Sequence, residues 1–253
     1  MPDTMKFIYV TIGFFVGIVI AMWGIKTWKN FQIISNIPTS KIRSIAMGLV
    51  EIKGKVLPKK ESSLASPFTK KPCVWYQYTI EEYRKSGKSS RWVTLKKASA
   101  GEKFFCQDDT GCVLIDPRGA KLDVALDAVF NSGFGKDPPQ NVMSFLKESK
   151  MSFEGFLGIN KTMRYREWYL KRGDAIYVLG KAGDNPHVEE GTAINNNEDL
   201  MIGKGGSIFI ISDKEEKQLL NSMKQNALWG IVSGGILMAL CLAGLLLELN
   251  VLR

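Results

Sequence analysis

The chain has 253 residues, a formal net charge of +9 and a hydrophobic share of 45%. That share is ordinary for a globular chain, but the longest apolar runs lie at the two ends, so their position is more informative than the average. One of the four cysteines lies inside the second apolar run and the other three are an odd number. This excludes a complete disulfide framework and agrees with a reducing compartment.

Two apolar segments predict membrane-spanning helices, at residues 7–25 and 227–247. Neither contains a charge, and at about 1.5 Å per residue each is long enough to cross a hydrocarbon core of roughly 30 Å. The alternative for the first segment is a cleaved signal peptide, which needs small residues at its cleavage site. Met22, Trp23 and Ile25 follow Ala21 instead, so a retained anchor is favoured.

The distribution of basic residues predicts which side of the membrane the middle segment faces. At the two chain ends, beyond the spans, the basic residues are Lys6, which Asp3 balances, and Arg253. The middle segment is flanked by more cations, namely Lys26, Lys29, Lys214, Lys217 and Lys224. Because basic flanks mark the cytoplasmic face, we expect a two-pass integral membrane protein whose middle domain is cytoplasmic.

Residues 28–211 are predicted to form one domain that is mainly β, barrel-like or sandwich-like, and α+β at most. Alternating or β-rich runs indicate eight or nine short strands. They lie at residues 47–56, 73–83, 92–96, 104–105, 112–115, 122–124, 163–170, 175–181 and 207–211.

Helix signals are sparse in this domain. A short helix is predicted at residues 139–147, beginning at a proline. Ser212 and Glu215 have the spacing of a capping box, which predicts an amphipathic connecting helix at residues 212–226 that runs into the second span at 227–247. A stiff connection to the membrane would follow.

Asp109-Thr110-Gly111 has the tripeptide sequence of aspartic proteases, in which two carboxylates share a proton. A single copy would require a dimer. The tripeptide lies between two β-rich runs, where a hairpin turn favours these residue types. The turn is therefore the favoured interpretation.

No catalytic, cofactor or metal site is predicted. Cys106 and Cys112 flank the same turn, but a structural zinc needs four ligands and the single histidine, His187, is distant in sequence. The run from Gly203 to Ser207 lacks the earlier glycine and the following helix of a phosphate loop. No nucleophile can be paired with a general base from sequence.

The positive charge has two alternative interpretations. Lysine clusters could face anionic lipid, or simply provide solubility. Nucleic acid is not expected as a partner, because basic residues are not interleaved with aromatic ones as in nucleic-acid-binding modules. The lysines in question are Lys53, Lys55, Lys59, Lys60, Lys70 and Lys71.

Several motifs in order resemble the GIDE domain, also called the domain beside a membrane, of membrane-anchored RING-type ubiquitin ligases of mitochondria and chloroplasts and of their prokaryotic relatives. The resemblance covers roughly residues 38–220. The motifs are Ile37-Pro38-Thr39-Ser40, Ser66-Pro67-Phe68, Pro72-Cys73-Val74-Trp75-Tyr76, Asp109-Thr110-Gly111, Asp116-Pro117-Arg118-Gly119-Ala120, and Glu167, Leu170 and Gly173 ahead of Ile176-Tyr177-Val178-Leu179-Gly180.

In the ligases of that family a RING domain binds two zinc ions through cysteines and histidines and recruits the ubiquitin-carrying enzyme. The four cysteines and one histidine of this chain are too few for a RING. The resemblance therefore implies a protein-recognition or scaffolding module, and ligase activity is not expected of this chain by itself. The alternative is a component of a ubiquitin ligase system that receives a zinc module in trans.

The candidate partner-binding residues are Trp75, Tyr76, Tyr78 and Trp92, with an unidentified protein as partner and membrane lipid as neighbour. The alternative, that these aromatic side chains fill a strand core, is the favoured one. A channel or transporter subunit is a third hypothesis, which the absence of charge within the spans disfavours.

Overall fold

The computed structural model describes residues 3–59, 64–87, 89–152, 160–186, 200–206, 208–214 and 216–248. The chain forms two compact units. One contains the two ends, Met1–Pro38 and Glu215–Arg253, and the other is Thr39–Lys214. Each unit is described by itself below.

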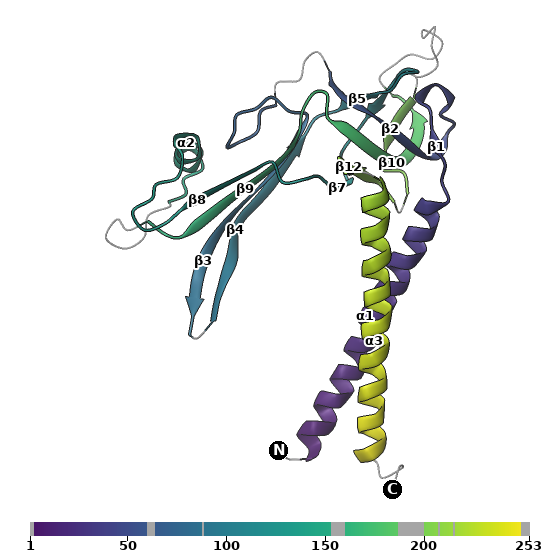
Figure 1. The fold of residues 1–253 in the computed structure, drawn as a ribbon, viewed down its shortest axis with the longest axis vertical. Coiled ribbons are helices and arrows are strands. Elements are labelled where there is room, and N and C mark those ends of the chain that lie inside the picture. The colour runs from purple at the N-terminus through teal and green to yellow at the C-terminus, as the bar shows by residue number, and fades with distance from the viewer. Residues whose placement is uncertain are drawn as a thin grey trace. The chain divides into compact units, whose positions relative to one another are not determined.

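The first unit is a pair of long helices, α1 (Asp3–Ser35) and α3 (Glu216–Glu248) (Figure 1). Both are long and apolar enough to cross a membrane, over Phe7–Ser35 and Leu220–Leu247, as predicted. Only 11% of the most apolar window of each helix is buried, so neither is the core helix of a globular domain. Helix α1 continues past residue 25 because Lys26 and Lys29 are good helix formers.

The two helices pack through small residues, which the sequence did not determine. A Cβ atom built on Gly24 would lie 2.6 Å from the backbone nitrogen of Ile231, and one on Gly234 would lie 2.6 Å from that of Ala21. The backbones are thus in direct contact. Small residues allow this approach in membrane helices, where there is little hydrophobic force to bring helices together.

The core of the second unit is a closed five-stranded barrel. Its strands are β2 (Gly48–Pro58), β5 (Phe104–Gln107), β6 (Cys112–Ile115), β10 (Ala175–Asp184) and β11 (Leu200–Gly203). Hydrogen-bonded neighbours follow the order β2-β5-β6-β11-β10, and β10 returns to β2. The mainly β, barrel-like fold class is therefore confirmed.

The connectivity of this barrel is that of an OB-type barrel. All neighbouring pairs are antiparallel except the third and fifth strands in chain order, β6 and β11, which are parallel. Such barrels have many unrelated ligands. Connectivity alone therefore assigns no function.

Four further segments extend the barrel. Strand β1 (Thr39–Ser40) runs parallel to β2 and is followed by the short helix η1 (Ile42–Ser44). Strand β12 (Ile210–Ser212) pairs with β10, and β7 (Lys121–Asp123) pairs with β12.

Two insertions into the barrel form a second sheet. The hairpin of β3 (Trp75–Ser86) and β4 (Ser89–Gly101) lies between β2 and β5 in the chain. Strand β8 (Ala128–Ser132), helix α2 (Gln140–Glu148) and β9 (Met163–Leu170) lie between β6 and β10. The insertions meet because β3 pairs with β9, which gives the order β4-β3-β9-β8.

Each sheet has its own apolar core. The barrel is filled by aliphatic and aromatic residues that include Phe104, Val178 and Ile202. Gly180 belongs to this interior because a Cβ there would collide with Phe209 and Ile202. The second core lies between the second sheet and α2 and is largely aromatic, with Phe68 in edge contact with Tyr78, Phe130, Phe145 and Tyr165.

The predicted strands correspond to β2, β3, β4, β5, β6, β7, β9, β10 and β12, and the predicted short helix is α2. Strands β1, β8 and β11 were not predicted; they have two, five and four residues and show little alternation. Ser207, the first residue of the strand predicted at 207–211, lies outside the described residues. Glu215 also lies outside them, so the capping box of Ser212 and Glu215 stays a prediction. So do the predicted domain boundaries, although α3 is one unbroken helix from residue 216.

Candidate functional site

The four aromatic residues predicted to bind a partner have different environments. Trp75 is 6% exposed and belongs to the barrel core, and Tyr78 is 5% exposed in the second core. Tyr76 is half-buried against the second core and stacks on Tyr78. Trp92 is the most exposed of the four, at 37%. A partner at the surface can contact Trp92 without rearrangement of a core.

The two faces of the second sheet differ because side chains alternate along each strand. Helix α2 and its core cover the face that contains Tyr76, Tyr78 and Ile80 (Figure 1). The opposite face, here called the open face, contains Thr79 and Glu81 of β3 and the residues paired with them. Besides Thr79 and Glu81, it includes Tyr83, Trp92, Lys97, Val129, Asn131, Arg164, Arg166 and Trp168.

The centre of the open face is a buried carboxylate that two arginines hold. Glu81 is 5% exposed and accepts hydrogen bonds from Arg164, at 2.7 Å, and from Arg166. Each guanidinium also contacts a tryptophan ring, Arg164 at 4.4 Å from Trp92 and Arg166 at 5.4 Å from Trp168. Because these contacts fix the arginines, the open face is preorganised.

At one end of the open face the rings of Tyr83 and Trp92 contact each other across β3 and β4 in a tilted arrangement, with ring centroids 5.2 Å apart. At the other edge Val129 is 44% exposed on β8. Large apolar side chains are therefore accessible on both sides of the arginine cluster.

Residues of the family motifs mostly hold the fold together. Thr39 donates a hydrogen bond to buried Glu51 at 2.5 Å, and the hydroxyl of Tyr177 donates to the other oxygen at 2.9 Å. This links β1, β2 and β10 through one carboxylate. A buried carboxylate is stable only when its oxygens are satisfied in this way.

Glu167 is a second buried carboxylate that holds separate segments together, here in the second sheet. Its side chain is fully buried and accepts hydrogen bonds from the backbone N–H of Phe68 and from the backbone N–H and hydroxyl of Thr69, at 2.6, 3.1 and 2.7 Å. The turn that follows Ser66 and Pro67 is thereby fixed to β9. Phe68 is thus placed in the centre of the aromatic core.

Asp109-Thr110-Gly111 is a turn between β5 and β6, as predicted. The neighbouring Asp108 stabilises it, accepting hydrogen bonds from the backbone of Thr110 and Gly111 and from the hydroxyl of Thr110, and another from the backbone of Ile42. Burial would raise the pKa of Asp108, but these donors outweigh it and lower the pKa. Asp109 lies at the surface beside Lys41, an arrangement with no role for a protease dyad.

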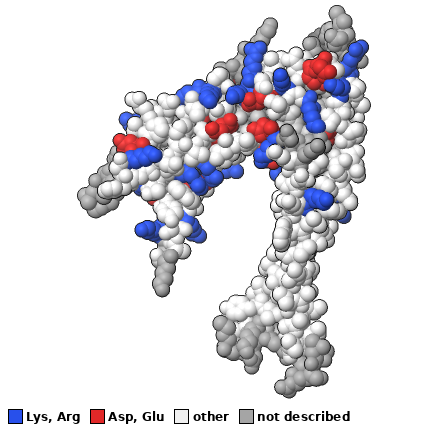
Figure 2. Space-filling view, in the orientation of Figure 1, with Lys and Arg blue, Asp and Glu red and all other residues white. Residues whose placement is uncertain are grey.

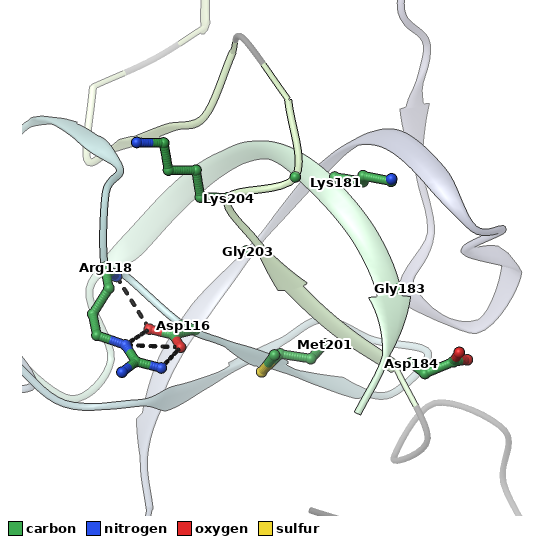
Figure 3. Close-up of a pocket in the computed structure, with 9 residues that line it drawn as sticks. Asp116, Arg118, Lys181, Gly183, Asp184, Met201, Gly203 and Lys204 are labelled. Carbon is green, nitrogen blue, oxygen red and sulfur yellow. Dashed lines mark hydrogen bonds and ion pairs between the residues drawn. The ribbon is translucent and has the colours of Figure 1, made fainter. Parts of the chain in front are cut away.

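A pocket of about 550 Å³ lies at one end of the barrel (Figure 3). The parallel pairing of β6 and β11 brings Asp116 and Arg118 close to the Gly203–Gly205 segment, which the sequence did not indicate. Arg118 donates hydrogen bonds to Asp116, and this lowers the pKa of that carboxyl.

The aliphatic stems of the two pocket lysines, Lys204 and Lys181, pack against glycines, but their ammonium groups do not converge. A Cβ on Gly119 would lie 2.6 Å from Cδ of Lys204, and a Cβ on Gly205 would lie 2.3 Å from Cδ of Lys181. Figure 3 shows the two lysines on opposite sides of the segment through Gly203. The glycines thus make room for lysine stems, and the two ammonium groups do not form a shared anion site.

Two buried thiols are poorly suited to nucleophilic chemistry. Burial raises the pKa of both Cys73 and Cys106 to about 12, and only a thiolate is an effective nucleophile. His187 lies outside the described residues. Over the described part of the chain, no group of three or more His, Cys, Asp or Glu side chains is arranged to hold a metal ion.

Comparison with known proteins gives one match. The family model GIDE, described as E3 ubiquitin ligase, matches residues 76–246. These residues include most of the second unit and most of α3. No curated protein and no solved structure matches the chain significantly. Because the family model covers more than half of the chain, the protein belongs to the GIDE family.

Proposed function

We propose that this chain is a membrane-tethered recognition or scaffolding module that binds a protein partner through the open face of the second sheet. The observation that carries the proposal is the accessible row of Trp92, Arg164 and Val129 around a fixed Glu81–arginine cluster. Tryptophan, tyrosine and arginine are the residue types that dominate binding energy at protein interfaces.

The rigidity of the open face supports this role. Arg164 and Arg166 are already ordered by Glu81 and by stacking on tryptophan rings. Ordering a long side chain on binding costs about 0.5–1.5 kcal/mol, so a partner that meets these arginines avoids most of that cost.

The tether is the pair of apolar helices α1 and α3. The basic residues that flank the middle segment, including Lys26, Lys29 and Lys224, support a cytoplasmic orientation of the second unit. The proposed partner is then a cytoplasmic protein or the cytoplasmic part of another membrane protein.

The test is crosslinked affinity capture of the full chain from its native membrane, with mass spectrometry after stringent detergent washing. Trp92→Ala and Val129→Arg are compared with Asn141→Arg, which alters an exposed position of α2. We expect about a 30-fold loss of the captured partner for Trp92→Ala, as for a residue that contributes about 2 kcal/mol to an interface.

Circular dichroism of each purified variant controls for folding. Equal capture by all three folded variants would contradict the proposed surface. An unrelated two-helix anchor serves as a further control. If it captures the same partner, recognition by the second unit is contradicted altogether.

The family description favours one second candidate, a component of a ubiquitin ligase system. In this candidate the chain works together with a RING-type zinc module that is supplied in trans. A RING-bearing protein in the washed eluate, with ubiquitin transfer that depends on Trp92, would support this candidate. Transfer unaffected by the open-face variants would count against it.

A further inference from the structure

The central rows of the open face carry a surplus of positive charge. From β4 to β8, one row across the sheet is Lys97, Thr79, Arg166 and Val129. The next row is Thr94, Glu81, Arg164 and Asn131. The two rows thus contain three cations and one carboxylate, and Figure 2 shows basic side chains gathered along the β3–β4 hairpin. A negatively charged partner surface would complement this distribution.

Two buried polar atoms in the first of these rows have no hydrogen-bond partner. They are Oγ1 of Thr79 and Nε of Arg166, and over the described residues they are the two buried side-chain polar atoms in this state. Thr79 is only 5% exposed. Arg166 donates to Glu81 through Nη2, so its Nε–H is still available. Because a buried polar group without a partner costs stability, such a pair requires an explanation.

Both atoms lie beside an exposed lysine. Thr79 is directly opposite Lys97 on one side and directly opposite Arg166 on the other. Cβ atoms of directly opposite residues in antiparallel strands are about 4.5–5.5 Å apart. One hydroxyl, one N–H and one ammonium group therefore occupy adjacent positions on the open face. All three can donate a hydrogen bond to the same anion.

We propose that Lys97, Thr79 and Arg166, here called the Thr79 site, bind the carboxylate of an aspartate or glutamate of the protein partner. The inference rests on the proposed function and names the chemistry of its partner. The carboxylate accepts hydrogen bonds from Oγ1 of Thr79 and Nε of Arg166 and forms an ion pair with Lys97. The Lys97 side chain is exposed and has a flexible stem, so it can move to admit the carboxylate.

The donors of the Thr79 site favour a carboxylate over a phosphate. The same face already holds one carboxylate, because Glu81 pairs with Arg164 and Arg166. A carboxylate has one charge on two oxygens, which matches one N–H, one hydroxyl and one ammonium group. A phosphate monoester has nearly two charges and three acceptor oxygens, so the available donors would leave it incompletely satisfied. The expected partner segment is therefore rich in aspartate or glutamate.

The experiment treats native membranes that contain the tagged full chain with a carbodiimide. This reagent joins a lysine amine to a carboxylate in direct contact, with loss of water and without a spacer. Mass spectrometry of the proteolysed, stringently washed eluate maps the junctions. We expect an amide bond between Lys97 and an aspartate or glutamate of the partner. None is expected at Lys147 of α2, which is also exposed.

Thr79→Val separates recognition from folding. Valine has the shape of threonine without its hydroxyl, so the variant removes a buried unpartnered group and is expected to keep a urea midpoint at or above that of wild type. Affinity capture of the partner is expected to fall about tenfold, as for a lost hydrogen bond to a charged group. Thr79→Ser retains a hydroxyl and is expected to capture more partner than Thr79→Val. A purely structural hydroxyl would instead lower the midpoint and the capture together.

Lys97→Gln tests the charge of the Thr79 site and is expected to reduce capture about tenfold. Lys147→Gln removes the same charge from α2 and is the matched control, with no change expected. Salt should weaken capture by wild type between about 0.05 M and about 0.5 M, because it screens an exposed ion pair. The same salt change should affect Lys97→Gln less.

The outcomes distinguish this inference from the proposed function. A partner that depends on Trp92 but forms no junction with Lys97, or that Thr79→Val captures as well as wild type does, would overturn the inference and leave the proposed function standing. Loss of capture after phosphatase treatment would also overturn it, because the bound anion would then be a phosphate. An eluate without a Trp92-dependent partner rejects both proposals.

Discussion

Asp108 and Asp109 are adjacent in the chain but differ in what they do. Asp108 accepts hydrogen bonds from three residues and connects η1 to the β5–β6 turn, while Asp109 forms only an exposed ion pair with Lys41. Composition predicted a turn at this place. The different roles of the two aspartates depend on Ile42, which is 66 residues from Asp108 in sequence. This difference could not be predicted.

Asp108→Ala is expected to lower the free energy of unfolding by about 1–3 kcal/mol, because it leaves partly buried backbone donors without an acceptor. Asp109→Ala is the matched control and is expected to leave the urea midpoint unchanged, since exposed ion pairs contribute little. Urea unfolding of the full chain in detergent measures both. Equal midpoints for the two variants would contradict the turn-stabilising role.

Two other aspartates are expected to shift stability with pH in opposite directions. The Arg118 side chain lowers the pKa of Asp116, so its contribution is present above about pH 3.8 and is lost as the pH falls. Burial raises the pKa of Asp213, so its ionisation at neutral pH costs stability, and that cost is relieved as the pH falls.

Urea midpoints of wild type, Asp116→Asn and Asp213→Asn between about pH 7 and pH 3 test this. The advantage of wild type over Asp116→Asn is expected to shrink as the pH falls. Relative to Asp213→Asn, wild type is expected to gain as the pH falls through the raised pKa. Parallel curves for all three proteins would contradict both assignments.

At the scale of elements, the packing of α1 against α3 gives a direct prediction. A Cβ on Gly13 would lie 2.8 Å from Sγ of Cys241, close to the separation across a disulfide. Gly13→Cys is therefore expected to form an intramolecular disulfide with Cys241 on mild oxidation in the membrane. Mass spectrometry of proteolysed protein identifies the linked peptides.

Ile12→Cys, on an exposed side of α1, is the matched control and is expected to stay unlinked within one chain. Adding Gly24→Leu to Gly13→Cys is expected to reduce the crosslink strongly, because leucine cannot fit where the two backbones touch. A crosslink that is indifferent to Gly24→Leu would show that the helices do not pack through their glycines.

For the whole molecule, the charge distribution predicts that both chain ends lie on one side of the membrane and the second unit on the cytoplasmic side. A tag placed before Met1 should be accessible from outside intact cells, whereas a cysteine at Ser144 should react with an impermeant maleimide only after the cells are opened. The reverse pattern would contradict the orientation. Access to both sites from one side would contradict two spans.

The two apolar helices, most strands, α2 and the family could be predicted from the amino-acid sequence. These features are local, because length, apolar runs and alternation need no knowledge of distant residues. Motif residues such as Glu167 marked the family, yet the sequence did not show that Glu167 fixes a distant turn to β9. For Trp75 and Tyr78 the sequence favoured core packing but left partner binding open.

The choice of neighbouring strands, and therefore the closure of the barrel and the meeting of the two insertions, depends on long-range packing that the sequence did not reveal. Pairing of β3 with β9 joins residues more than 80 positions apart. The loop-closure entropy and the contact energy of such a pairing cannot be read from a local sequence pattern. That pairing orders Arg164 and Arg166 around Glu81 and leaves Trp92 exposed. The candidate site is thus a product of long-range packing, whereas the membrane helices follow from composition alone.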